Sequence, residues 1–229
     1  GSFKAGADEK KCLLISSFTE ALAHGLLKSP GYFGADLVAG EGQSLGMSKS
    51  FGGPGLGLLA GTKQMMRNLP GRFVGKTKDS KGSRGYVLTL ATREQHIRRD
   101  KATSNICTNS ALIALRATVY MSLVGPRGIA DLATQIVQRS HYALNALCEL
   151  EGVSRVGDGP FFREFVIRLP KPAEQVVERI FENHQILAGI PLSRFEADRP
   201  HDLLVAVTEK RSVADINALV TALQGELER

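Results

Sequence analysis

The chain has 229 residues, 43% of them apolar, and a formal net charge of +6. This length allows one large domain or two small ones around a buried core. No uncharged apolar run reaches the roughly 18–20 residues of a membrane span, so we predict no membrane spans. The three cysteines are widely spaced, which predicts reduced thiols and a cytoplasmic protein, and no histidine pair has metal-ligand spacing, so we expect no metal site.

Short apolar runs in the first ninety residues have the length of β-strands. They are Cys12–Ser16, Asp36–Gly40, Gly55–Ala60 and Tyr86–Leu90. A fold seldom begins with a buried strand, so the position of the first run indicates a piece of a larger α/β domain. We predict a short helix over Lys63–Asn68 and a turn or hairpin tip over the polar segment Lys76–Gly85.

Two helices are predicted in the middle of the chain. The first is an apolar helix that runs to Val124, which Asn105 or Thr108 can cap and a Gly-Pro pair ends. The second runs from about Arg127 to Leu150, where apolar residues recur at helical spacing.

The pattern from Val153 onward changes to strand, strand, helix, strand, helix. Phe161–Leu169 alternates, with Phe165 and Ile167 on one face. The expected helix faces are Val176, Val177, Ile180 and Phe181, then Ile216, Leu219, Val220, Leu223 and Leu227 after a near capping box at Ser212 and Asp215. We therefore expect residues 1–104 in a large domain, 105–152 as connecting helices, and 153–229 as a small α/β domain with helices on one side of a mainly antiparallel sheet.

Basic residues are concentrated in one part of the chain. Between Lys63 and Lys101 there are eleven Lys and Arg against three acids, a net charge of +8. Such a zone favours an anionic partner. An acidic protein surface or a small carboxylate or phosphate fits the pattern, whereas the lack of interleaved aromatics and of a recognisable module argues against nucleic acid.

The segment Arg93–Thr108 reads R-E-Q-H-I-R-R-D-K-A-T-S-N-I-C-T. It combines four basic residues, two acids, a histidine and a cysteine directly before the apolar helix, as expected for functional groups mounted on a packed element. The whole segment is therefore a candidate functional site. The alternative is an ordinary solvated helix face or linker.

Gly40–Gly57 has seven glycines in eighteen residues. Glycines let backbone amides approach an anion closely, yet the spacing matches neither a P-loop nor a dinucleotide fingerprint. A tight connection between strands, pressed against another subunit, explains the composition equally well. Lys49 is a weak candidate for a Schiff-base lysine.

Several motifs resemble glycine dehydrogenase (decarboxylating), the P-protein family of the glycine cleavage system, and its subunit 1 type in particular. They are G-A-D-x-V-x-G-E-G-Q-S-L-G (Gly34–Gly46), S-F-G-G-P (Ser50–Pro54), M-x-R-N-L-P-G-R-x-V-G (Met66–Gly75) and the segment Arg93–Thr108. The resemblance extends from about Lys10 to the end of the chain. It implies the α/β fold of fold type I pyridoxal-phosphate (PLP) enzymes, the aspartate-aminotransferase fold, and matches the carboxy-terminal half of a subunit about twice this length.

The resemblance also implies an activity and its partners. In the family, PLP is the electron sink while glycine loses CO2, and the aminomethyl group passes to the lipoyl arm of the H-protein. Laying the family's His-Lys-Thr segment on the glycine-rich loop puts Gln43 at the position of the Schiff-base lysine, with Lys49 beyond the turn. We therefore expect PLP on a partner, glycine dehydrogenase subunit 2, and an inactive isolated chain.

The same resemblance implies a place at a dimer interface, because fold type I sites form between subunits. The candidate residues that would serve the partner's site or the interface are Glu94, His96, Arg98, Asn105, Cys107 and Thr108. Arg98 or Arg99 would then hold a carboxylate or phosphate, and His96 would carry a proton. Cys107 is expected to pack rather than to act as a nucleophile. We expect a dimer or higher oligomer, and the competing interpretation is a purely structural scaffold for the PLP-bearing partner.

Overall fold

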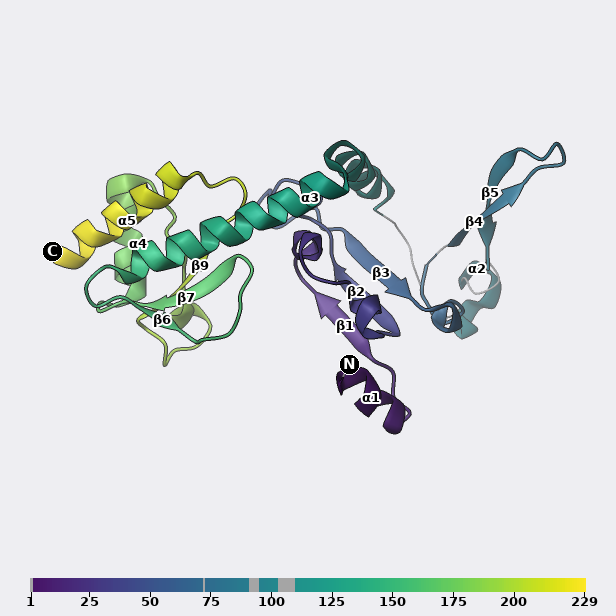
Figure 1. Cartoon of the computed structure of the whole chain (residues 1–229), viewed down its shortest axis with the longest axis horizontal. Helices are drawn as coiled ribbons and strands as arrows, with labels where there is room; N and C mark the ends of the chain where they lie inside the picture. Colours follow the sequence, from purple (N-terminus) through teal and green to yellow (C-terminus); the bar gives the residue numbers. More distant parts are fainter. Residues whose placement is uncertain (1, 72, 91–94, 103–109) are drawn as a thin grey trace. The chain divides into compact units, whose positions relative to one another are not determined.

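The computed structural model describes residues 2–71, 73–90, 95–102 and 110–229. The chain divides into two compact units, an amino-terminal unit (Gly1–Gly125) and a carboxy-terminal unit (Pro126–Arg229), and each is described by itself. Figure 1 shows their elements in chain order. The boundaries expected at 104/105 and 152/153 stay predictions.

The amino-terminal unit begins with a helix, α1 (Ser2–Glu9), which was not predicted. Lys4 of α1 contacts both carboxylate oxygens of Asp36, at 3.1 and 2.9 Å, and the same carboxylate accepts the backbone N–H of Leu14. These contacts hold the pKa of Asp36 below its ordinary value, the Leu14 hydrogen bond being the largest cause.

A three-stranded sheet follows, in the order β1 (Ile15–Phe18), β2 (Leu37–Glu41), β3 (Gly57–Gly61). β1 runs parallel to β2, and β3 is antiparallel to β2. Three expected strands are therefore present with shifted ends, but the first is not a buried strand, since Ile15 is 58% exposed. The short 3₁₀ helices η1 (Ala21–Gly25), η2 (Pro30–Phe33) and η3 (Lys63–Met65) connect or flank these strands.

A separate hairpin pairs β4 (Phe73–Lys78) with β5 (Arg84–Thr89). The expected hairpin tip is confirmed but shorter than predicted, because both strands extend into it. Asp79 closes the turn: its Oδ1 accepts the backbone N–H groups of Lys81 and Ser83, each at 2.8 Å. The short helices α2 (Gln95–Arg98) and η5 (Arg99–Lys101) come next.

Helix α3 spans Ala111–Cys148 and is interrupted at Gly125, whose φ of 66° and ψ of 174° are not helical. The two predicted helices are thus present, with the Gly-Pro pair between them. The first half, residues 111–124, was expected to be a packed element, yet most of its large apolar side chains are exposed. The most exposed are Leu112 (76%), Leu115 (59%), Val119 (50%) and Leu123 (82%).

The carboxy-terminal unit has a four-stranded antiparallel sheet in the order β6 (Ser154–Val156), β7 (Glu164–Arg168), β9 (Asp202–Ala206), β8 (Ile190–Pro191). Phe165 and Ile167 of β7 stand opposite Val205 and Leu203 of β9, and all four are buried. The face that carries them packs against the second half of α3, α4 (Ala173–His184) and α5 (Val213–Glu228). The expected antiparallel α/β layer is confirmed.

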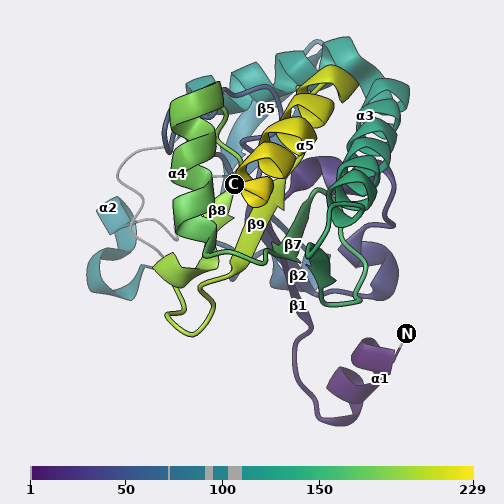
Figure 2. The ribbon, with the colours of Figure 1, turned by 90° about the vertical axis from the view of Figure 1, so that its left-hand side faces the viewer.

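Helices α4 and α5 contact each other on this sheet, as Figure 2 shows. The expected face of α4 is right for three residues and wrong for Phe181, which is 44% exposed. The capping box of α5 forms as predicted, with Ser212 and Asp215 exchanging side-chain-to-backbone hydrogen bonds. Among the described helices, none combines the length and the apolar character that crossing a membrane requires.

Candidate functional site

The glycine-rich segment is the connection between β2 and β3, and Glu41 ties its two ends together. Oε1 of Glu41 accepts the backbone N–H of Gln43 at 2.8 Å and that of Leu56 at 2.7 Å. The backbone N–H of Gly42 donates to the carbonyl of Leu56 at 2.7 Å. One carboxylate therefore satisfies an amide at each end of a fifteen-residue loop, residues 42–56, and closes it into a ring.

The first half of α3 holds this loop from the side. Nε of Arg116 donates to the carbonyl of Gly46 at 2.9 Å. Gly46 has φ +91°, and a Cβ there would lie 2.8 Å from Cβ of Tyr120. Both the left-handed backbone and the close approach require glycine at this position. Leu45 and Met47 on either side are buried, so the first half of the loop is packed rather than free.

Gln43, the residue at the expected lysine position, sits inside this packed half. Its Nε2 donates to the carbonyl of Pro54 at 3.4 Å, across the loop. A carboxamide has no nucleophilic amine, so it cannot form an imine with an aldehyde. Lys49 lies in the exposed half of the loop, beyond Met47. The expected position of the Schiff-base lysine therefore holds an amide in this loop, and its equivalence with that lysine stays a prediction.

The carboxyl ends of the parallel strands β1 and β2 are the usual ligand edge of an α/β sheet. Here the ring of Phe18, the last residue of β1, lies on Gly40 of β2: a Cβ at Gly40 would come within 2.3 Å of it. The imidazole of His24 meets the same ring edge-on, with centroids 4.8 Å apart. Protein side chains therefore fill the space above Gly40, and this part of the edge does not fit a PLP ring.

The structure brings together only part of the second candidate set. His96 and Arg98 share the four-residue helix α2 and are exposed. Arg99 follows in the left-handed region, with φ 53°. The remaining candidates, Glu94, Asn105, Cys107 and Thr108, lie outside the described residues. Whether the set converges on one site stays a prediction.

Sequence reasoning missed Glu41 and Arg116, the two side chains that fix the loop. Glu41 lies inside the quoted family motif, but a glutamate in a sequence gives no sign that it will accept two backbone N–H groups. Arg116 did carry a signal, because it is the only charged residue between Ile106 and Val124. In the structure Arg116 is exposed, and its Nε donates to the carbonyl of Gly46.

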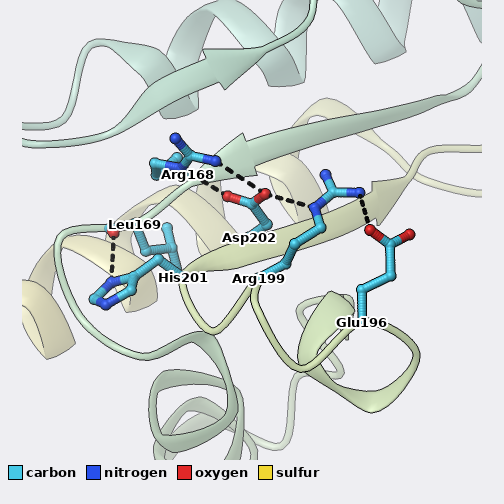
Figure 3. A network of polar contacts seen from close by, with 6 residues as sticks. All are labelled: Arg168, Leu169, Glu196, Arg199, His201 and Asp202. Carbon is cyan, nitrogen blue, oxygen red and sulfur yellow. Dashed lines mark hydrogen bonds and ion pairs between the residues drawn. The ribbon is translucent and has the colours of Figure 1, made fainter.

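A second polar centre lies in the carboxy-terminal unit, around Asp202 (Figure 3). The side chain of Asp202 is 1% exposed and accepts Nε of Arg168 at 2.8 Å, Nη2 of Arg168 at 3.1 Å and Nε of Arg199 at 2.8 Å. Arg199 continues to Glu196 at 3.4 Å. Hydrogen bonding by Arg168, then by Arg199, keeps the pKa of Asp202 below its ordinary value although burial opposes this.

This centre has a structural role in the unit. Arg168 and Asp202 stand opposite each other in the β7–β9 register. Nδ1 of His201 donates to the carbonyl of Leu169 at 3.1 Å, and the backbone N–H of Leu169 donates to the carbonyl of His201 at 2.9 Å. These bonds fasten the end of β7 to the start of β9. Because both guanidinium groups face Asp202, their charges are partly neutralised within the unit.

Comparison with known proteins gives a consistent result. The family described as "Glycine cleavage system P-protein" matches residues 2–223. The probable glycine dehydrogenase (decarboxylating) subunit 1 of Chloroherpeton thalassium is 47% identical over 221 residues, which is 96% of this chain and 48% of that protein. The corresponding protein of Moorella thermoacetica is 51% identical over 203 residues, 89% of this chain and 46% of that protein.

Solved structures agree. The inhibitor-bound crystal structure of glycine decarboxylase (P-protein) matches with a TM-score of 0.87 and 40% identity, over 96% of this chain and 50% of that one. A NifS-like protein from Rickettsia africae matches with a TM-score of 0.63 at 13% identity, over 97% of this chain and 56% of that one, and so shows the fold alone.

The expected fold class is confirmed by these structures, since the neighbours share the fold of fold type I PLP-dependent enzymes. The chain spans about half the length of the curated relatives that it matches. A family match over residues 2–223 and these identities lead to one conclusion: the chain belongs to the P-protein family of the glycine cleavage system, with relatives of the glycine dehydrogenase (decarboxylating) subunit 1 type.

Proposed function

We propose that this chain belongs to the non-lysine half of the P-protein. It supports PLP-dependent decarboxylation of glycine and transfer of the aminomethyl group to the lipoyl arm of the H-protein. PLP is bound covalently by glycine dehydrogenase subunit 2, and this chain completes the assembly. The observation that carries the proposal is Gln43, an amide in the packed half of the loop whose nitrogen is directed to Pro54.

The side chains of this chain would then position the loop and bind anionic groups, and none of them would form a covalent bond with PLP. Glu41 and Arg116 hold the loop in one conformation. His96 and Arg98 are exposed on α2. In a partner's site the guanidinium would pair with a carboxylate or phosphate, and the imidazole would move a proton near neutral pH. In the assembled enzyme PLP supplies the electron sink for loss of CO2.

The first experiment tests the covalent claim on the chain itself. The chain is incubated with PLP, reduced with borohydride and digested, and the labelled peptides are identified by mass spectrometry. We expect only scattered, substoichiometric labelling of surface lysines. One stoichiometric adduct at Lys49 would overturn the assignment to the non-lysine half.

The second experiment tests the contribution to catalysis. Subunits 1 and 2 are assembled with H-protein, and exchange of labelled bicarbonate into glycine is measured for wild type, His96→Gln and Arg98→Gln. We expect exchange only with both subunits, and a loss of turnover in the variants while the subunits still co-elute. Variants that lose assembly but keep turnover per assembled complex would favour the scaffold interpretation.

A further inference from the structure

The β4–β5 hairpin presents one exposed face along its whole length. Directly opposed residues on this face form three pairs: Val74 with Leu88, Lys76 with Tyr86, and Lys78 with Arg84. Val74, Tyr86 and Leu88 are each 63% exposed, and the three cations are exposed as well. On the other face Phe73, Gly75, Gly85 and Thr89 are half-buried, whereas Thr77 and Val87 are exposed. The face therefore grades from an apolar base to a cationic tip.

The tip is both charged and held in shape. Residues 73–89 contain four basic side chains, Lys76, Lys78, Lys81 and Arg84, and one acid, Asp79, for a net charge of +3. The carboxylate of Asp79 is also bound within the turn, because its Oδ1 accepts two backbone N–H groups there. The guanidinium carbon of Arg84 lies 6.0 Å from the centre of the Tyr86 ring, so these side chains stand over the same face.

Charge complementarity selects an acidic partner for this face. A polynucleotide would use the cations but not the opposed pair Val74 and Leu88, whereas a protein surface uses both. A permanent subunit interface would bury a larger and more apolar area than a six-residue ribbon offers. A small, cationic face with an apolar base is typical of transient docking guided by charge.

We infer that this face, the ribbon face, is a docking site for a carboxylate-lined surface of the protein carrier, the lipoyl-bearing H-protein. The inference rests on the proposed function, which makes the H-protein a partner. The ribbon face speeds the encounter with the H-protein and aligns it, and forms no covalent bond with it. It adds to the assembly a site separate from the loop at Gln43 and from the candidates on α2.

The test measures association of H-protein with the assembled enzyme by surface plasmon resonance at low and at physiological salt. The variant Lys78→Glu/Arg84→Glu reverses the directly opposed pair at the tip. We expect association about tenfold slower than for wild type, a deficit that shrinks as salt rises. The variant Val74→Ser/Leu88→Ser removes the apolar pair and should mainly speed dissociation, by about threefold.

The matched control is Arg179→Glu/Lys210→Glu, which makes the same change in net charge at exposed positions of the carboxy-terminal unit. It should bind H-protein as wild type does. Equal slowing by the control and the tip variant would mean that net charge alone acts, and would overturn the inference. So would tip variants that no longer assemble with subunit 2, or that bind H-protein normally while losing affinity for a polyanion such as heparin.

The bicarbonate exchange of the wild-type assembly separates the two claims. If wild type exchanges and the ribbon variants bind H-protein normally, the docking inference fails and the proposed function stands. If wild type does not exchange with subunit 2 and H-protein present, the proposed function fails first and the docking inference with it.

Discussion

Replacing Asp202 by asparagine is the sharpest test of how the carboxy-terminal unit is held together. The substitution keeps the shape and one acceptor oxygen but removes the charge that three donor contacts from Arg168 and Arg199 share. A hydrogen bond to a charged group contributes about 1.5–3 kcal/mol, and breaking a fully buried ion pair costs about 3–5 kcal/mol.

The structure sets the expected value at the lower end of this range. Asp202 is 1% exposed, but the side chains of Arg168 and Arg199 are 58% and 27% exposed, so both can turn to water when the charge is lost. We expect the free energy of unfolding to fall by about 3 kcal/mol at pH 7. With a urea dependence of about 1.5 kcal/mol per molar, the midpoint for this unit moves down by about 2 M.

The assay is urea unfolding followed by far-ultraviolet circular dichroism, with hydrogen exchange of the β7 and β9 amides to assign the transition to this unit. The control is Asp198→Asn, at an exposed position nearby. Because the pKa of Asp202 is lowered in the folded state, its contribution is fully present above the unfolded value near 4 and is lost as pH falls through the lower folded value.

The gap between wild type and Asp202→Asn should therefore be constant from pH 7 to about pH 4.5 and close only at lower pH. A gap below about 0.5 kcal/mol at pH 7, the size of an ordinary surface change, would refute the reasoning from burial and pairing. A gap that closes already above pH 5 would refute the direction of the pKa shift.

Three further predictions follow from other parts of the chain. Arg116→Met should raise hydrogen exchange in the loop 42–56 about fivefold, the equivalent of about 1 kcal/mol for one hydrogen bond, whereas unchanged exchange would show that packing alone holds the loop. Limited proteolysis should cut near Gly157 before it cuts within Phe161–Leu169, and early cleavage inside that strand would contradict the compact unit. Light scattering at several micromolar should show a dimer formed through the exposed apolar face of residues 111–124, and a stable monomer would contradict it.

The carboxy-terminal unit was predictable because its local signals agree with its packing. Alternation along β7 put Phe165 and Ile167 on the buried face, and the capping box at Ser212 marked the start of α5. Phe181 was misplaced because helical spacing defines a stripe but not its width. Phe181 is 44% exposed, whereas Val176, Val177 and Ile180 are buried.

The amino-terminal unit was harder to predict. Strand β4 carries Gly75, Lys76 and Lys78 beside the β-branched Val74 and Thr77, so its sequence gives a mixed strand signal, and its pairing with β5 decides its conformation. The apolar half of α3 was expected to be packed, but apolar composition cannot say whether the covering surface belongs to the same chain. Leu115 and its neighbours are exposed in this chain.

The candidate site residues came from a family motif, and their roles stay predictions. The family motif located Gln43 and the segment that contains His96, since a motif specifies residue types at fixed spacing. It could not reveal that Arg116, seventy residues from Gly46, reaches the glycine-rich loop, because that contact depends on how the chain folds back.

The closure of the loop by Glu41 has a consequence for how its sequence can be changed. Because Glu41 fixes both ends of the loop, the length of its exposed half has little effect on stability. Doubling the length of a flexible loop costs only about 0.6 kcal/mol in closure entropy. Gly52 and Gly53 have open space where a side chain would be added. Short insertions at this point, such as an epitope or a fluorophore-binding tag, should therefore be tolerated, whereas the single change Glu41→Gln would weaken both anchors at once.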